Sequence, residues 1–242
     1  MSSRRLEILR AIVDEYVATQ EPVGSKSIAD HHGLGISPAT IRNEMAVLED
    51  EGLITQPHTS AGRIPTDLGY RVFVDKLTTV KQLSTAERRA IETFLQGSND
   101  LEELLKRSAK LLADITKQVA VVTYPISGEG HEKMAISGTA NLARSSEDLG
   151  LTLSPILEAL EEQVILLRLL DEVHSTVHVR IGSEQTEANL QSTSLVTVGY
   201  GGESSQLGAV GVLGPTRMDY AASIAAVDAV ARYVGRFINE GP

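Results

Sequence analysis

The stretch from Ser37 to Gly52, SPATIRNEMAVLEDEG, constrains the fold of this chain more than any other. A hydroxyl that can cap a helix is followed by proline at the first helical position, which is a strong helix start. Ile41, Met45 and Leu48 then recur at helical spacing on one stripe, and Gly52 ends the helix. We therefore predict a short amphipathic helix that buries one stripe and exposes the opposite one.

The segments around this helix follow the order of a winged helix-turn-helix. The predicted elements are a helix over residues 1–17, a helix over 26–32 capped by Ser25, a turn over 33–35, a strand over 53–56, a loop over 57–63, a return strand from Ile64 and a helix capped by Thr66. Gly62 is expected to let the loop turn tightly, with Arg63 at its tip. The helix from Ser37 would then be the recognition helix, and the loop would be the wing.

The remainder of the chain predicts a helical connector and then an α+β domain. A capping box, Ser84 to Glu87, opens one connector helix, and Asn99 or Asp100 opens the next. Beyond them we expect strands over residues 118–124, 176–181, 194–200 and 208–213, and helices over 153–170 and 221–238. The predicted domains are a winged helix over 1–77, the connector over 78–117 and a C-terminal domain over 118–242.

The charge of the chain argues against nucleic acid, while the local pattern argues for it. The formal net charge is -10, and from Met1 to Lys76 eight Lys and Arg stand against eleven Asp and Glu. A basic patch over the whole head is therefore absent. We expect the acids Glu49 to Glu51 to lie at the far end of the recognition helix, with Lys26, Arg42 and Arg63 on the near side.

The exposed side of the predicted recognition helix carries residue types that suit a DNA groove. Small side chains at Ala39 and Ala46 allow close approach, while Thr40 and Asn43 can hydrogen-bond bases, and Arg42 can bind guanine or phosphate bidentately. The helix N-terminus at Ser37 suits a phosphate oxygen, and Arg63 can enter a minor groove. Units of this shape also serve as protein-interaction modules, and spacing alone leaves that alternative open.

Other constellations favour structural explanations. His174 and His178 lack a third residue at ligand spacing, so they predict surface histidines and no metal site. Gly208, Gly211 and Gly214 lack the Gly-Lys-Ser/Thr of a phosphate loop and predict close backbone packing. No residue pattern indicates an enzyme or a cofactor. The absence of cysteine fits a reducing cytoplasm, and no apolar run reaches the roughly 18–20 residues of a membrane span.

Several motifs together resemble one family, the heat-inducible transcription repressor HrcA. The head, PVGSKSIADHHGLGISPATIRNEMAVLEDEGLITQPHTSAGRIPTDLGYRVFVD, is similar to that family's N-terminal part. GTANL, LEALEEQVILLRLL, IGSE and GPTRMDY are similar to its C-terminal half. The two parts match independently and in order. Only about a dozen residues lie between the strand ending near Tyr124 and GTANL, where typical members carry a long segment, so the chain resembles an internally shortened member.

The resemblance implies a function. It implies a winged helix joined to a GAF-like domain, incomplete here, and a cytoplasmic homodimer that binds an inverted-repeat operator, called CIRCE, upstream of chaperone operons. Repression would be lifted by heat stress, and the chaperonin GroEL would keep the repressor active. The residues that fall on the family's recognition helix are Ser37, Thr40, Arg42 and Asn43, and those on its wing are His58, Thr59 and Arg63. The alternative is a GAF-like regulator that binds a small molecule and uses its winged helix as a protein surface.

Overall fold

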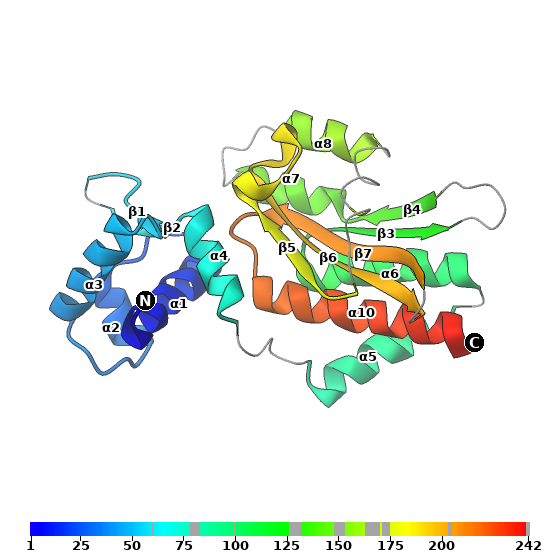
Figure 1. Ribbon diagram of the computed structural model, residues 1–242, viewed down its shortest axis with the longest axis horizontal. Helices are drawn as coiled ribbons and strands as arrows, with labels where there is room; N and C mark the ends of the chain where they lie inside the picture. Colours follow the sequence, from blue (N-terminus) through cyan, green and yellow to red (C-terminus); the bar gives the residue numbers. More distant parts are fainter. Residues whose placement is uncertain are drawn as a thin grey trace. The chain divides into compact units, whose positions relative to one another are not determined.

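Two units make up the chain, Met1–Thr78 and Thr79–Pro242. The structure is a computed structural model that describes residues 1–59, 61–77, 83–98, 100–125, 132–147, 153–162, 170, 175–202 and 205–240. Figure 1 labels the helices and strands of both units. The units are described separately below.

The first unit is a winged helix-turn-helix. Its elements are α1 (Ser3–Thr19), α2 (Ser25–His31), α3 (Pro38–Asp50), β1 (Ile54–Thr55), β2 (Ile64–Pro65) and α4 (Asp67–Asp75). The strands β1 and β2 pair antiparallel, and Val23 adds an isolated bridge to Arg63. The core of the unit is formed by the buried faces of the helices, with Ile8, Ile12, Ile28, Ile41 and Leu48 fully enclosed. The predicted architecture of the head is therefore confirmed.

Three local features of the head test the predicted caps and turn. Ser25 is the first residue of α2 and is buried, while Gly24 takes the N-cap position without a side-chain hydrogen bond, so the predicted Ser25 cap is wrong. The turn between α2 and α3 contains Gly33 and Gly35 at φ 60° and 67°, a left-handed backbone that glycine adopts without strain. Thr66 caps α4 as predicted, since its hydroxyl accepts from the Gly69 N–H at 3.1 Å.

The second unit is built on a five-stranded antiparallel sheet. Its strands are β3 (Val119–Pro125), β4 (Glu132–Ser137), β5 (His178–Ile181), β6 (Thr193–Gly202) and β7 (Ser205–Pro215). They lie in the order β4-β3-β7-β6-β5, so all five strands form one continuous sheet. The strands β6 and β7 form a long hairpin with an irregularity between Tyr200 and Gly201.

Helices cover both faces of this sheet (Figure 1). α6 (Leu101–Thr116) and α10 (Tyr220–Glu240) pack on one face, and α5 (Thr85–Leu95) packs against both of them. α7 (Thr139–Glu147) and α8 (Leu153–Glu161) cover the other face, where Val119, Val121 and Leu213 meet Leu142 and Ile156 in one apolar cluster. The result is the expected α+β architecture, with α5 and α6, where a connector was predicted, inside the second unit.

The sequence patterns located most of the described α-helices and strands of the second unit and missed one of each. The capping box at Ser84 and Glu87 is confirmed, and Asp100 caps α6 by accepting from the Glu103 N–H at 2.7 Å. β4 and α7 were not predicted. Of the predicted helix over 153–170, the structure describes residues 153–162 and Leu170, with α8 ending at Glu161, and His174 lies outside the described residues.

The spacing of glycines in β7 reflects close packing, as predicted. A Cβ at Gly208 would lie 2.3 Å from the Thr123 carbonyl oxygen, and one at Gly214 would lie 1.9 Å from the Gln118 side chain. Contacts this short exclude any side chain without a shift of the neighbours. These glycines therefore allow β7 to lie against its neighbours.

Candidate nucleic-acid interface

The recognition helix α3 exposes its N-terminal half on one side and buries its apolar stripe on the other. Ser37 is the N-cap, and its hydroxyl accepts from the Thr40 N–H at 3.2 Å and lies 3.0 Å from the Thr40 hydroxyl. Ile41, Met45 and Leu48 are buried, as predicted. The side chains left at the surface are Ala39, Arg42, Asn43 and Ala46, with Thr40 half-buried. A capped helix N-terminus with an arginine and an amide on one exposed face can present hydrogen-bond donors to a polar groove.

Backbone hydrogen bonds anchor the base of the wing. Val23 and Arg63 exchange two backbone hydrogen bonds of 2.9 Å, which tie the return strand to the segment before α2. Within the loop, the Gln56 amide donates to the carbonyl oxygens of Thr59 and Ala61 at 3.1 and 2.9 Å, and the Ala61 N–H donates to His58 at 2.8 Å. These bonds leave His58 and Thr59 exposed on the wing. Ser60 lies outside the described residues.

Gly62 is required for a reason that differs from the prediction. Its φ is not among the positive values of the chain, so a tight left-handed turn does not explain it. A Cβ at this position would lie 2.5 Å from the carbonyl carbon and oxygen of Val23 and 2.6 Å from the carbonyl carbon of Pro22. Gly62 therefore permits the close approach of the wing base to the chain before α2.

Arg63 does not lie at the tip of the wing. It directly precedes β2, and its guanidinium binds the Glu49 carboxylate, with Nη2 and Nε 2.8 and 3.0 Å from Oε2. The expectation that the acids at the end of α3 face away from the cations is therefore wrong for Glu49. Glu49 also follows Arg42 by seven residues, so it lies on nearly the same side of α3, about 10.5 Å further along the axis.

Other acids of α3 are directed at α1. Arg5 donates from Nε to Glu44 at 2.8 Å and from Nη1 to Glu51 at 3.0 Å. Hydrogen bonding to Glu44 raises the pKa of Arg5 more than partial burial lowers it, and the charge of Glu51 adds to the rise. Three of the four carboxylates of residues 44–51 are thus paired with two arginines, so the negative field around α3 is weaker than four isolated carboxylates would produce.

The predicted cations differ in their partners. Arg42 is exposed, and within the described residues its side chain has no ion pair. Lys26 is exposed in the first turn of α2. Of the three, Arg63 is the one that a carboxylate of the described residues engages. Sequence reasoning placed Arg42 and Lys26 at the surface and missed the Glu49–Arg63 pair.

A second network, which the sequence patterns missed, fixes α2 against α1. The Glu15 carboxylate accepts from the Ser27 hydroxyl and lies 3.1 Å from His32 Nε2. Ser27 also lies 3.2 Å from His31 Nδ1. Among the described residues, no group of three or more His, Asp and Glu side chains could hold a metal ion. The network therefore orients the two helices that support α3.

Comparison with known proteins gives the same reading of both units. The family description "Winged helix-turn-helix transcription repressor, HrcA DNA-binding" matches residues 1–79, and "HrcA protein C terminal domain" matches residues 126–224. With the capped recognition helix and the anchored wing, the first match defines a winged-helix transcription repressor that binds DNA.

Full-length relatives identify the particular family. The heat-inducible transcription repressor HrcA of Nocardioides sp. (strain ATCC BAA-499 / JS614) is 43% identical, over 98% of this chain and 99% of that protein. The repressor of the same name from Streptomyces avermitilis is 42% identical, over 99% of each chain. The chain belongs to the heat-inducible transcription repressor HrcA family. A crystal structure of a protein described only as hypothetical has the same fold, with a TM-score of 0.83, 23% identity and 99% of both chains covered.

The chain is internally shorter than these relatives, as its sequence predicted. The alignment with the Nocardioides protein is 333 positions long, whereas this chain has 242 residues, so at least 91 aligned positions have no residue here. Because the alignment covers 98% of this chain and 99% of the relative, the missing positions are internal.

No helix in the described part of the chain combines the length and the apolar character that crossing a membrane requires.

Proposed function

We propose that the head binds an inverted-repeat, CIRCE-type operator upstream of chaperone operons and represses them until heat stress. The observation that supports this most directly is the face of α3 that carries Ala39, Arg42 and Asn43. It is exposed beside a capped N-terminus, while the opposite stripe is buried in the head. The names of the relatives, heat-inducible transcription repressors, favour the same role.

Each predicted contact has a distinct part in this proposal. Ala39, Thr40, Arg42 and Asn43 face base edges in the major groove, where a guanidinium and an amide discriminate best. Lys26, Ser37, His58, Thr59 and the backbone N–H of Ala39 position the head on the phosphate backbone, because Pro38 has no N–H and the Thr40 N–H is bound by the Ser37 hydroxyl. Arg63 joins them only after its guanidinium leaves Glu49 for a phosphate oxygen.

The proposed assembly is a homodimer in the cytoplasm. An inverted repeat has two-fold symmetry, so two heads related by the same symmetry would read its half-sites. Heat would release the operator by shifting the population of the C-terminal units or of the dimer. A GroEL-type chaperonin would raise the active fraction.

Arg42→Ala tests the proposed reading of bases. We expect it to weaken binding to the inverted repeat by about 1–3 kcal/mol, and to weaken binding to a random duplex much less. The measurement is a pair of anisotropy titrations with labelled duplexes at fixed salt. Arg71→Ala is the charge-matched control, because Arg71 pairs with Asp75 within α4. Equal losses on both duplexes would mean that Arg42 contacts phosphate only.

Light scattering of the chain, with and without the inverted-repeat duplex, tests the dimer. Two chains per duplex are expected, and a single chain per duplex would contradict the proposal. A gel shift of the inverted-repeat duplex, with and without added chaperonin, tests whether the chaperonin raises the active fraction of the repressor. The alternative, a small-molecule regulator whose winged helix binds protein, requires the inverted repeat to bind no better than a random duplex.

A further inference from the structure

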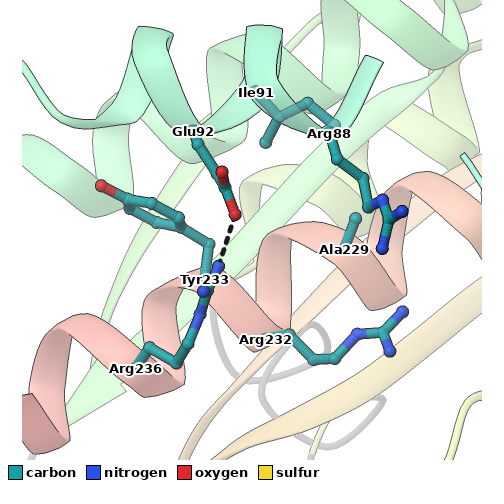
Figure 2. A pocket seen from close by; sticks show the side chains of 7 residues that line it. All are labelled: Arg88, Ile91, Glu92, Ala229, Arg232, Tyr233 and Arg236. Atoms are coloured by element: carbon teal, nitrogen blue, oxygen red, sulfur yellow. Dashed lines mark hydrogen bonds and ion pairs between the residues drawn. The ribbon is translucent and has the colours of Figure 1, made fainter. Parts of the chain in front are cut away.

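A groove of about 380 Å³ lies between α5 and α10 in the second unit, and arginine dominates its lining (Figure 2). Arg88 enters it from α5, and Arg232 and Arg236 enter it from α10. Ile91 and Ala229 supply its apolar part. The volume falls in the range of small-ligand sites, which is roughly 300–1,000 Å³.

The groove is positive in a chain that is strongly negative. Its lining residues include three arginines and one acid, Glu92, whereas the whole chain has a formal net charge of -10. Low-dielectric walls lined by one sign of charge concentrate ions of the opposite sign. With Glu92 and the Asp228 that pairs with Arg232, the three arginines still exceed the acids by one, so the groove favours anions over cations.

The three guanidinium groups differ in how they are engaged. Arg236 donates from Nη2 to Glu92 at 2.7 Å, which links α10 to α5, and it lies 5.7 Å from the centre of the Tyr233 ring. Arg232 pairs with Asp228 one turn earlier on α10, at the surface. Arg88 has no ion pair to any residue that the structure describes.

Arg88 and Arg232 are therefore the groups that a ligand can recruit. Figure 2 shows both side chains extending to the same side of the groove, away from the Glu92–Arg236 pair. An exposed pair one helical turn apart, such as Arg232 with Asp228, is weak and exchanges readily for a better acceptor. Guanidinium groups bind phosphate bidentately, and two that line the same groove can each take one of two linked phosphates.

We propose that this groove binds a small anion with two or more phosphate groups, held by Arg88 and Arg232. Arg236 and Glu92 fix the groove by joining its two walls. Burial raises the pKa of Tyr233, so its phenol stays protonated beside Arg236 and adds no negative charge to the site. The site belongs to the second unit and needs no contact with DNA.

Calorimetry of the full chain at low salt, without Mg²⁺, tests the site with inorganic tripolyphosphate and orthophosphate at equal ionic strength. Tripolyphosphate is expected to bind about tenfold more tightly, because only it engages both guanidinium groups. Arg88→Gln and Arg232→Gln should each weaken its binding about tenfold. Both side chains are exposed, so the melting temperature without ligand should not change.

Two control variants make the result decisive. Arg89→Gln removes the same charge from the next residue of α5, which does not line the groove, and should change binding less than twofold. Arg42→Gln removes the exposed arginine of the recognition helix, where a polyphosphate could mimic DNA. An equal loss in Arg89→Gln, a full loss in Arg42→Gln, or equal affinity for the two phosphates would each overturn the proposal.

Discussion

Glu49→Gln separates the two roles that Arg63 can have. The variant removes the carboxylate charge that holds the guanidinium at 2.8 Å and keeps the shape of the side chain. The side chains of Glu49 and Arg63 remain 34% and 22% exposed, so solvent screens the pair, and its contribution to stability is about 0.2–1 kcal/mol. We expect the free energy of unfolding of the head to fall by no more than that.

The same change should strengthen binding to DNA. In the variant, Arg63 can contact DNA without first breaking its ion pair with Glu49, which costs about 0.2–1 kcal/mol. Removing this cost corresponds to about a 1.4- to 5-fold gain in affinity for DNA at 50 mM salt. If the released guanidinium adds one phosphate contact, the slope of log affinity against log salt becomes steeper by about 0.9. Raising the salt from 50 to 200 mM would then lower the affinity of the variant for DNA about 3.5-fold more than that of the unsubstituted protein.

Anisotropy titrations of a random duplex at 50, 100 and 200 mM salt measure both quantities. Asp50→Asn is the matched control, because it removes the same charge from the adjacent, exposed position. A gain in Asp50→Asn equal to that in Glu49→Gln would mean that general repulsion, and not the release of Arg63, is responsible. Weaker binding in Glu49→Gln would refute the reasoning, since the pair would then hold the wing in the shape that DNA needs.

Two further substitutions test how the units are built. Gly62→Ala should destabilise the head by about 1–3 kcal/mol in urea denaturation, because its Cβ would overlap the Val23 backbone. Gly24→Ala, whose Cβ meets nothing within 4 Å, should cost less, about 0.5–1 kcal/mol, because it changes only the N-cap of α2, and a loss equal to that of Gly62→Ala would contradict this account. Asn141→Ala removes the donor to the carbonyl oxygens of Ala113 and Gln118, and should cost about 1–3 kcal/mol. Arg144→Ala, which removes only an exposed contact to the Asn141 side chain, should cost under about 0.5 kcal/mol.

Features that depend on a few neighbouring residues could be predicted from the sequence. Ser37 with Pro38, and Ser84 with Glu87, determine helix starts through hydrogen bonds within one turn. The stripe of Ile41, Met45 and Leu48 fixes which side of α3 is buried. These signals were sufficient to place the recognition helix and its exposed residues.

Features that depend on how distant segments meet could not be predicted. Glu49 and Arg63 are joined because the hairpin returns its second strand beside the end of α3, and no periodicity in either segment encodes that approach. The GTANL segment shows no strong helical stripe, and its structure depends on contacts with a distant segment. Gly138 adopts φ 84°, and the Asn141 amide donates to the carbonyl oxygens of Ala113 in α6 and of Gln118 just after α6. Glycine is likewise needed at position 62 because this residue lies close in space to Val23, which is 39 positions earlier in the sequence.

The pairing of acids around α3 changes how the charge of the head bears on DNA binding. Glu44 and Glu51 share one arginine, Arg5, on the α1 side, and Glu49 pairs with Arg63 on the wing side. A paired carboxylate repels a phosphate less than an isolated one does, so these acids repel DNA less than their number alone suggests. The same pairs, however, occupy two of the arginines that a basic repressor would offer to the backbone. The contacts that remain are Arg42, Lys26, neutral hydrogen-bonding groups and the helix N-terminus, which favours reading bases over neutralising phosphates.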